Sequence, residues 1–107
     1  MAFLSYSFRD LQSYIWTRDS FTVTNTENVD VVLVQYGQTT GGAVNLKYSL
    51  VISPDSFWYW YGPIQVNGKY KSSSRTITFE DVSPGTYYLL IENEGTDIAI
   101  GNGHIYY

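Results

Sequence analysis

An alternation of apolar and polar residues, repeated in short runs along the chain, most constrains what this sequence can fold into. The clearest run covers residues 44–53. A period of two is that of a β-strand with one face in a core and the other in water. We therefore expect a strand here, with its apolar positions on the core side. These positions are Val44, Leu46, Tyr48, Leu50 and Ile52, and the opposite face carries Asn45, Lys47, Ser49 and Ser53.

Further short runs of this kind recur between turn signals, and none has the length and period of an ordinary helix. Residues 29–36 and 86–93 are apolar on both faces, as central strands are. The remaining strands are expected at 3–8, 21–25, 64–66, 69–71, 76–80 and 104–107, with extended structure up to residue 16 and a single turn near residues 9–12. About eight or nine strands indicate an all-β antiparallel β-sandwich, immunoglobulin-like or jelly-roll, as one domain over residues 1–107. A closed barrel is the alternative.

Local signals also predict where the chain turns. Asn67-Gly68 is typical of a type I′ turn, which needs positive φ at both central positions, so a hairpin is expected there. Residues 72–75, "SSSR", indicate a polar loop. Residues 101–103, "GNG", indicate a bulge or kink before the last strand.

Composition excludes several classes of function. The formal charge is -4, and the six Lys and Arg residues are spread along the chain, so we expect no nucleic-acid partner. The chain has no cysteine, which rules out disulfides, thiolate chemistry and Cys-based zinc sites. No apolar run approaches the length of a membrane span. Residues 1–11 lack the basic region and long apolar core of a signal peptide.

The sequence offers little for catalysis. It contains one histidine, His104, and none of the common nucleophile, zinc-protease or phosphate-loop motifs. A glycosidase would need only two carboxylates, but the candidates lie in turns, where carboxylates are usually solvated. These candidates are Asp55, Asp81, Glu92 and Glu94. We predict that the protein is not an enzyme and has no cofactor.

The candidate binding site is "SFWYWYG", residues 56–62. If this stretch is extended, Trp58 and Trp60 share one face, and Phe57, Tyr59 and Tyr61 the other. Pro54 and Pro63 bound it as a short edge strand or loop, so at least one face is expected to be exposed; which one stays open. Sugars stack their apolar faces on such rings and bond to nearby amides and hydroxyls. The predicted carbohydrate-binding residues are Trp58, Trp60, Tyr61, Gln65, Asn67 and Tyr70.

Two other functions fit the same sequence. Tyr and Trp are preferred anchors of protein interfaces, so the aromatic run could dock a protein partner or a second copy of the chain, as in a secreted effector or an envelope component. Oxygen-rich loops can also hold calcium in an accessory domain. The acidic residues that could do so are Glu80, Asp81, Glu92, Glu94 and Asp97.

From Phe21 onward, the chain resembles a known family. "FTVTN", "VDVVLVQY", "YSLVI" and "VSPGTYYLLIEN" are similar to segments of the pre-peptidase C-terminal β-sandwich modules of secreted bacterial enzymes. Residues 84–88, "PGTYY", match the turn that precedes a late strand in those modules. The resemblance implies a non-catalytic accessory or surface module that is extracellular or on the cell surface.

Overall fold

The computed structural model describes residues 2–107, which form nine β-strands and, within that range, no helix. The alternation identified in the sequence accounts for most of them. The strands are β1 (Phe3–Leu11), β2 (Tyr14–Trp16), β3 (Phe21–Val23), β4 (Glu27–Gly37), β5 (Val44–Val51), β6 (Tyr61–Gly68), β7 (Tyr70–Val82), β8 (Gly85–Asn93) and β9 (Ala99–Tyr106).

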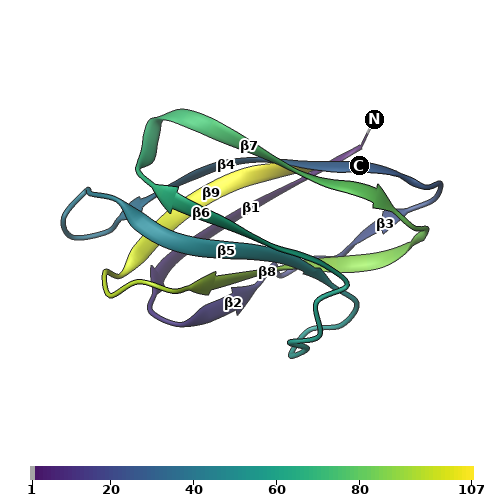
Figure 1. Ribbon diagram of the computed structural model, residues 1–107, viewed down its shortest axis with the longest axis horizontal. Helices are drawn as coiled ribbons and strands as arrows, with labels where there is room; N and C mark the ends of the chain where they lie inside the picture. Colours follow the sequence, from purple (N-terminus) through teal and green to yellow (C-terminus); the bar gives the residue numbers. More distant parts are fainter. Residues whose placement is uncertain (1) are drawn as a thin grey trace.

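The strands form two antiparallel sheets packed face to face (Figure 1). The first sheet has the order β1-β9-β4-β7. The second has the order β2-β8-β5-β6. β3 also pairs with β8, at residues 85–87, whereas β2 pairs with residues 90–92. The predicted β-sandwich is therefore confirmed, and two separate sheets rule out the closed barrel.

The pairing is nested, which identifies the sandwich as a jelly roll. β1 pairs with β9, β2 and β3 with β8, β4 with β7, and β5 with β6. With β2 and β3 counted as one interrupted strand, this is a long hairpin folded over into two sheets, as in an eight-stranded jelly roll. Residues 52–60, between β5 and β6, form the tip of that hairpin. Of the two predicted sandwich types, the jelly roll is confirmed.

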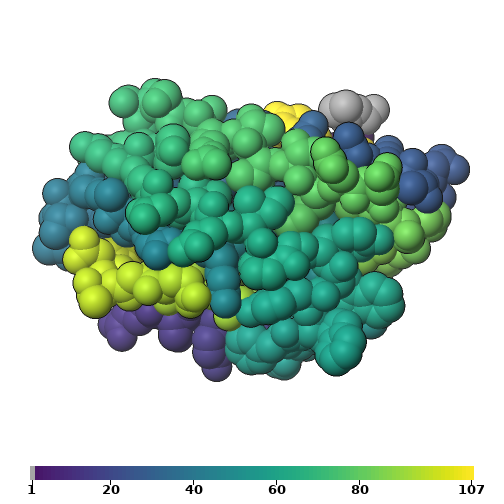
Figure 2. Space-filling view, viewed as in Figure 1, coloured from purple at the N-terminus to yellow at the C-terminus, as the bar shows by residue number. Residues whose placement is uncertain are grey.

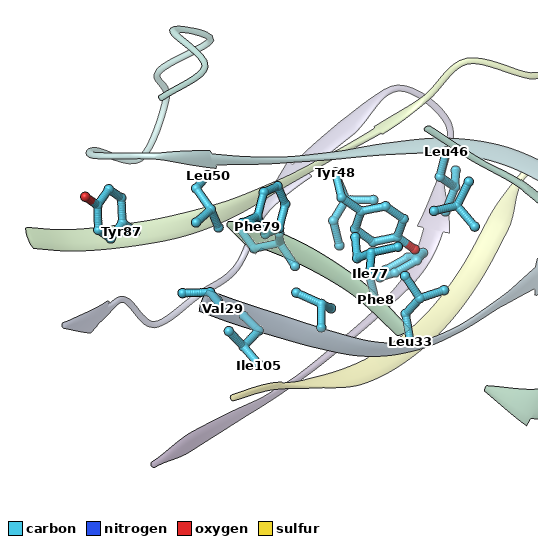
Figure 3. Packing of buried hydrophobic residues seen from close by; sticks show 14 of the residues in the cluster. Phe8, Val29, Leu33, Leu46, Tyr48, Leu50, Ile77, Phe79, Tyr87 and Ile105 are labelled. Carbon is cyan, nitrogen blue, oxygen red and sulfur yellow. The ribbon is translucent and has the colours of Figure 1, made fainter. Parts of the chain in front are cut away.

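The core lies between the two sheets and is built from the inward residues of each alternating run (Figure 3). Val29, Val31 and Leu33 of β4 face Leu46 and Leu50 of β5, and all five are fully buried. Together with the buried residues of β7 and β8, they form one continuous apolar cluster. This burial is the main favourable contribution to folding.

One polar group crosses this core. Gln35, fully buried on β4, accepts a hydrogen bond from the Tyr48 hydroxyl at 2.7 Å. Its Nε2 donates to the carbonyl oxygens of Val66 at 3.0 Å and Gly68 at 3.3 Å, with Val44 at 3.4 Å. Gln35 thus ties the first sheet to the ends of β5 and β6. Neither this residue nor its bonds was singled out from the sequence.

The glycines of β9 do not form the predicted kink, so that prediction was wrong. Gly101 and Gly103 lie within a regular ladder between β1 and β4. A Cβ on Gly101 would lie 2.3 Å from the Val34 carbonyl oxygen and 2.7 Å from the Phe8 ring. A Cβ on Gly103 would likewise meet the Tyr6 ring. The glycines therefore admit two aromatic rings against the strand backbone. The irregularity lies in β1 instead, between Phe8 and Leu11.

Three further local predictions were wrong. Asn67-Gly68 does not close a hairpin, because β6 and β7 lie in different sheets and the chain crosses between them there. Residues 72–75 belong to β7, although the ladder with β4 jumps from Tyr70 to Arg75 and leaves the intervening residues unpaired. Ile52 is half exposed, because β5 ends at Val51.

Candidate functional site

The aromatic stretch is mostly a loop, and it folds back over the outer face of the second sheet. The covered positions show this directly. Ser49 and Val51 of β5 and Leu90 of β8 point away from the sandwich core, yet all three are fully buried. Residues 52–60 join β5 to β6 beside these positions (Figure 1). We call residues 52–60 the aromatic loop.

Aromatic contacts and two hydrogen bonds anchor this loop. The Phe57 ring packs edge-on at 4.9 Å from the Tyr14 ring and 5.1 Å from the Trp16 ring, both on β2. Trp16 Nε1 donates to the Ser56 carbonyl oxygen at 2.9 Å. The Trp60 amide donates to the Leu50 carbonyl oxygen at 2.9 Å. Ring contacts and satisfied backbone groups of this kind define the path of the loop.

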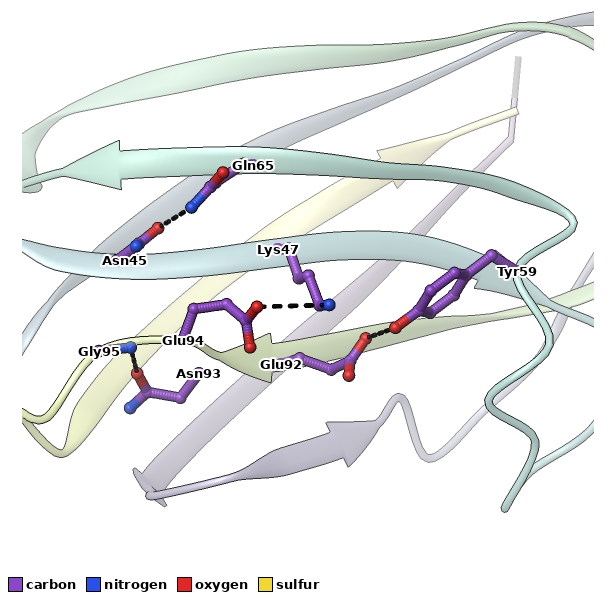
Figure 4. Close-up of polar contacts among 8 residues, drawn as sticks. All are labelled: Asn45, Lys47, Tyr59, Gln65, Glu92, Asn93, Glu94 and Gly95. Atoms are coloured by element: carbon purple, nitrogen blue, oxygen red, sulfur yellow. Dashed lines mark hydrogen bonds and ion pairs between the residues drawn. The ribbon is translucent and has the colours of Figure 1, made fainter.

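Tyr59 forms a third attachment (Figure 4). Its hydroxyl donates to Glu92 Oε1 at 2.6 Å, and the Lys47 ammonium lies 5.5 Å from its ring centre. Lys47 also pairs with Glu94 at 3.3 Å. The hydrogen bond to Glu92 raises the pKa of Tyr59, because the carboxylate favours the protonated phenol. The pKa of Lys47 is raised as well, chiefly through Tyr59 and then through the two glutamates.

The two loop tryptophans face the solvent. Trp58 is 74% exposed and Trp60 is 51% exposed, whereas Tyr59 between them is half-buried. Figure 2 shows the teal residues of the hairpin tip standing out at the lower right of the molecule. Tyr59 and Tyr61 are half-buried against the protein, and Phe57 contacts the rings of β2 but is itself 47% exposed, so the five rings do not divide cleanly into a covered face and a free face.

Beside the loop, the same sheet presents a polar surface, which we call the polar floor. It consists of the outward side chains at the open end of β5 and β6: Asn45, Lys47, Gln65 and Asn67. Residues 45 and 67 face each other across the ladder, as do residues 47 and 65. Gln65 Nε2 donates to Asn45 Oδ1 at 2.8 Å. Exposed rings next to amide groups are the combination that a sugar-binding surface needs.

The six predicted site residues do not all lie together: two are on the aromatic loop, two on the polar floor, and Tyr61 and Tyr70 on neither. Trp58 and Trp60 are on the aromatic loop, and Gln65 and Asn67 on the polar floor. Tyr61 begins β6, packs edge-on against the Tyr87 ring at 5.9 Å, and accepts a hydrogen bond from the Ser83 amide. The Ser83 side chain, and then its backbone amide, lower the pKa of Tyr61 by hydrogen bonding to its oxygen.

Tyr70 belongs to the opposite sheet. It lies on β7, packs partly against the core, and accepts a hydrogen bond from Arg75 at 3.2 Å. The predicted hairpin would have placed it next to Asn67 on one face. Because β6 and β7 lie in different sheets, the Tyr70 ring instead packs partly against the core and beside Gly68.

Sequence reasoning missed Tyr14 and Trp16, the rings under the loop. Their spacing of two indicated a shared face. Nothing in the sequence, however, linked β2 to a segment 40 residues away. Sequence reasoning also did not single out Asn45 and Lys47 as site residues, although the alternation placed both on the outer face.

The acidic residues do not gather into a metal site. Within residues 2–107, no three His, Cys, Asp or Glu side chains are placed to hold one ion. Glu92 is engaged by Tyr59 and Glu94 by Lys47, whereas Glu80 and Asp81 lie on β7. His104 is exposed on β9. Its Nδ1 lies 2.8 Å from Ser5 Oγ, and no carboxylate takes part in that contact.

A groove of about 400 Å³ lies at an open edge of the sandwich, between the edge strands β1 and β2, and Trp16 forms part of its lining. Its walls include Leu4, Tyr6, Ile15 and Ile91. It contains none of the predicted site residues. In the described part of the chain, no helix is long and apolar enough to cross a membrane.

Comparisons with known proteins support the fold. No protein-family model matches the chain, and no curated protein matches it in sequence. Among solved structures, it is similar to the pre-peptidase C-terminal domain of collagenase from Bacillus anthracis, with a TM-score of 0.56 and 14% identity. The match covers 98% of this chain and 88% of that chain. The resemblance drawn from residues 84–88 and the neighbouring strands is thus confirmed as a likeness of fold.

Proposed function

We propose that this chain is a non-enzymatic module that binds carbohydrate on the outer face of its second sheet. The observation that carries the proposal is the exposure of Trp58 and Trp60 on an anchored loop beside the polar floor. Exposure of two large aromatic rings to solvent is unfavourable in free energy unless a ligand covers them. A sugar ring offers an apolar face to the indoles and hydroxyl groups to the amides.

The anchoring of the loop matters for affinity. A mobile aromatic loop would lose conformational entropy on binding, at a cost of about 0.5–1.5 kcal/mol for each immobilised side chain. Here Phe57, Tyr59 and the Trp60 amide already hold the loop on the sheet. The tryptophans are therefore presented on a preformed support.

We also propose an extracellular or cell-surface location. The fold is shared with a domain of a bacterial collagenase, and the sequence segments resemble modules of secreted enzymes. Detection of the protein in culture medium or on intact cells would support this location. Its retention in the cytoplasm would contradict it.

The test of binding is an array of neutral and charged glycans probed with the wild-type chain and with Trp58→Ala and Trp60→Ala. Each substitution should abolish or strongly weaken the signal and leave thermal unfolding unchanged. Phe3→Ala is the matched control, because Phe3 is 60% exposed on β1, in the other sheet. Binding that survives both tryptophan substitutions would refute the site. An array with no bound glycan would refute the function.

A second candidate is docking of a protein or of a second copy of the chain. The observation in its favour is that Ile52, at 50%, and Phe57, at 47%, are exposed near the tryptophans and carry no polar group. Light scattering over a range of concentrations tests self-association. A mass that rises with concentration in the wild type, but not in Trp58→Ala, would favour this candidate over the sugar site.

A further inference from the structure

A small cleft lies at the end of the polar floor, on the β5–β6 side of the 93–97 turn. Its volume is about 170 Å³. Its polar walls come from Asn45 and Asn67 on the sheet and from Asn93, Thr96 and Asp97 on the turn. Side-chain amides, a hydroxyl and a carboxylate therefore converge on one space.

The turn that forms one wall is tied in place. Asn93 Nδ2 donates to the Asp97 carbonyl oxygen at 2.7 Å and to the Leu11 carbonyl oxygen at 3.0 Å, while its Oδ1 accepts from the Gly95 amide at 2.9 Å (Figure 4). The Glu94 amide donates to the Asn45 carbonyl oxygen at 2.8 Å. Every polar atom of the Asn93 side chain is thus used to shape the wall.

Some other polar side chains of the cleft have hydrogen-bonding groups with no partner among the described residues 2–107. Within residues 2–107, neither the Asn67 amide nor the Asp97 carboxylate makes a side-chain hydrogen bond, and both residues are exposed. Asn45 uses only its Oδ1, toward Gln65, which leaves its NH2 group free to donate. The cleft therefore combines a tied wall with free donors and acceptors.

The cleft and the aromatic loop share one face of the sheet. Asn45 and Lys47 are alternate residues of β5, so they lie about 7 Å apart along the strand. Tyr59 of the loop lies over Lys47 and Glu92, in the same cross-strand row. Tyr59 therefore joins the aromatic loop to the row of side chains next to Asn45, which lines the cleft.

The charges around this face select among sugar chains. Glu92, Glu94 and Asp97 are carboxylates, and Lys47 is already paired with Glu94. An acidic polysaccharide would bring like charges next to these groups, which is unfavourable. A neutral chain meets no such repulsion.

We infer that the cleft is a second subsite for the same ligand, and that this ligand is a neutral polysaccharide chain laid along β5 from the aromatic loop to Asn67 and Asp97. The inference rests on the proposed function. The tryptophans supply the stacking contact, and the cleft adds hydrogen bonds that only a longer chain can reach.

The test is titration calorimetry with disaccharides and hexasaccharides of neutral glucan, xylan and mannan, and with hexasaccharides of galacturonic acid. For one neutral series, the hexasaccharide should bind about ten-fold more tightly than the disaccharide, which is the effect of one or two net hydrogen bonds. Asn67→Ala should remove most of that gain, so that the ratio of the two affinities falls toward one. Galacturonic acid chains should bind the wild type weakly and Asp97→Asn more tightly.

Asn102→Ala is the matched control, since Asn102 is an exposed asparagine on β9, in the other sheet. Trp58→Ala should lower the affinity for both chain lengths. Equal affinity for short and long chains, or an Asn67→Ala variant with wild-type affinity for the hexasaccharide, would overturn the subsite alone. Preferential binding of galacturonic acid chains would overturn the choice of a neutral ligand. Wild-type protein that binds none of these sugars would overturn the proposed function itself.

Discussion

Replacing Gln35 tests whether one buried amide holds the two sheets together. Methionine has a similar length and no hydrogen-bonding amide, so Gln35→Met keeps much of the packing and removes the bonds. The Tyr48 hydroxyl then loses its only described partner, and the carbonyl oxygens of Val66 and Gly68 lose the amide donor. All these groups lie in or beside the core.

The magnitude follows from the groups left unpaired. A buried polar group without a partner costs about 1–3 kcal/mol. The Tyr48 hydroxyl bears this cost in full, whereas the carbonyl oxygens keep part of their pairing in the ladder. We therefore expect Gln35→Met to lower the free energy of unfolding by ~2–4 kcal/mol, and Tyr48→Phe by ~1–2 kcal/mol. In the double variant, neither side chain of the Tyr48–Gln35 pair leaves the other unpaired. The loss of unfolding free energy should therefore be smaller than the sum of the two single losses by ~1–2 kcal/mol.

Urea denaturation followed by tryptophan fluorescence measures these changes. With a slope of about 2 kcal/mol/M for a small domain, the midpoint for Gln35→Met should fall by roughly 1–2 M. Gln65→Met is the matched control, because Gln65 is exposed, and it should stay within about 0.5 kcal/mol of the wild type. A Gln35→Met midpoint equal to that of the control, or additive single losses in the double variant, would refute the reasoning.

Three other predictions follow from the structure. Gly101→Ala should destabilise the fold by more than ~2 kcal/mol, because a Cβ there would lie 2.3 Å from a carbonyl oxygen. Gly95→Ala is the control and should be tolerated, because the nearest atom to a Cβ at that position is 3.6 Å away. Equal melting temperatures of the two variants would contradict this. Tyr59→Phe removes the hydrogen bond to Glu92 and should increase acrylamide quenching of Trp16 beneath the loop; unchanged quenching would show that the bond does not hold the loop. Burial raises the pKa of Tyr48 well above its ordinary value of 10.0. The stabilisation from this protonated hydroxyl is therefore complete below pH 10.0 and falls as the pH rises above it, so the unfolding midpoint should drop above that pH, and less steeply in Tyr48→Phe.

Local alternation predicted most of the residues of β5 that face the core, although Ile52, which the same pattern placed inward, is half exposed. Val29, Val31 and Leu33 are buried as expected, and so are Val44, Leu46, Tyr48 and Leu50. The reason is physical: in a strand, the period of the side chains does not depend on which strand lies next to it. The β-sandwich class and the inward positions could therefore be derived from the sequence.

The candidate site was only partly predictable. Trp58 and Trp60 could be proposed because five successive aromatic residues cannot all be buried by one core face. Tyr70 was placed wrongly because Asn67-Gly68 was interpreted as a hairpin. A turn motif states that the chain changes direction. It does not state whether the next strand pairs in the same sheet or crosses to the other.

By itself, then, the sequence determined the all-β class, the core faces of the strands and the surplus of aromatic rings at residues 57–61. The tertiary structure alone decided which rings stay in water. It did so by folding the loop onto β2, where Tyr14 and Trp16 receive Phe57, and onto β8, where Glu92 binds Tyr59. These partners are distant in sequence, and contacts of that kind depend on strand order, which no local pattern encodes.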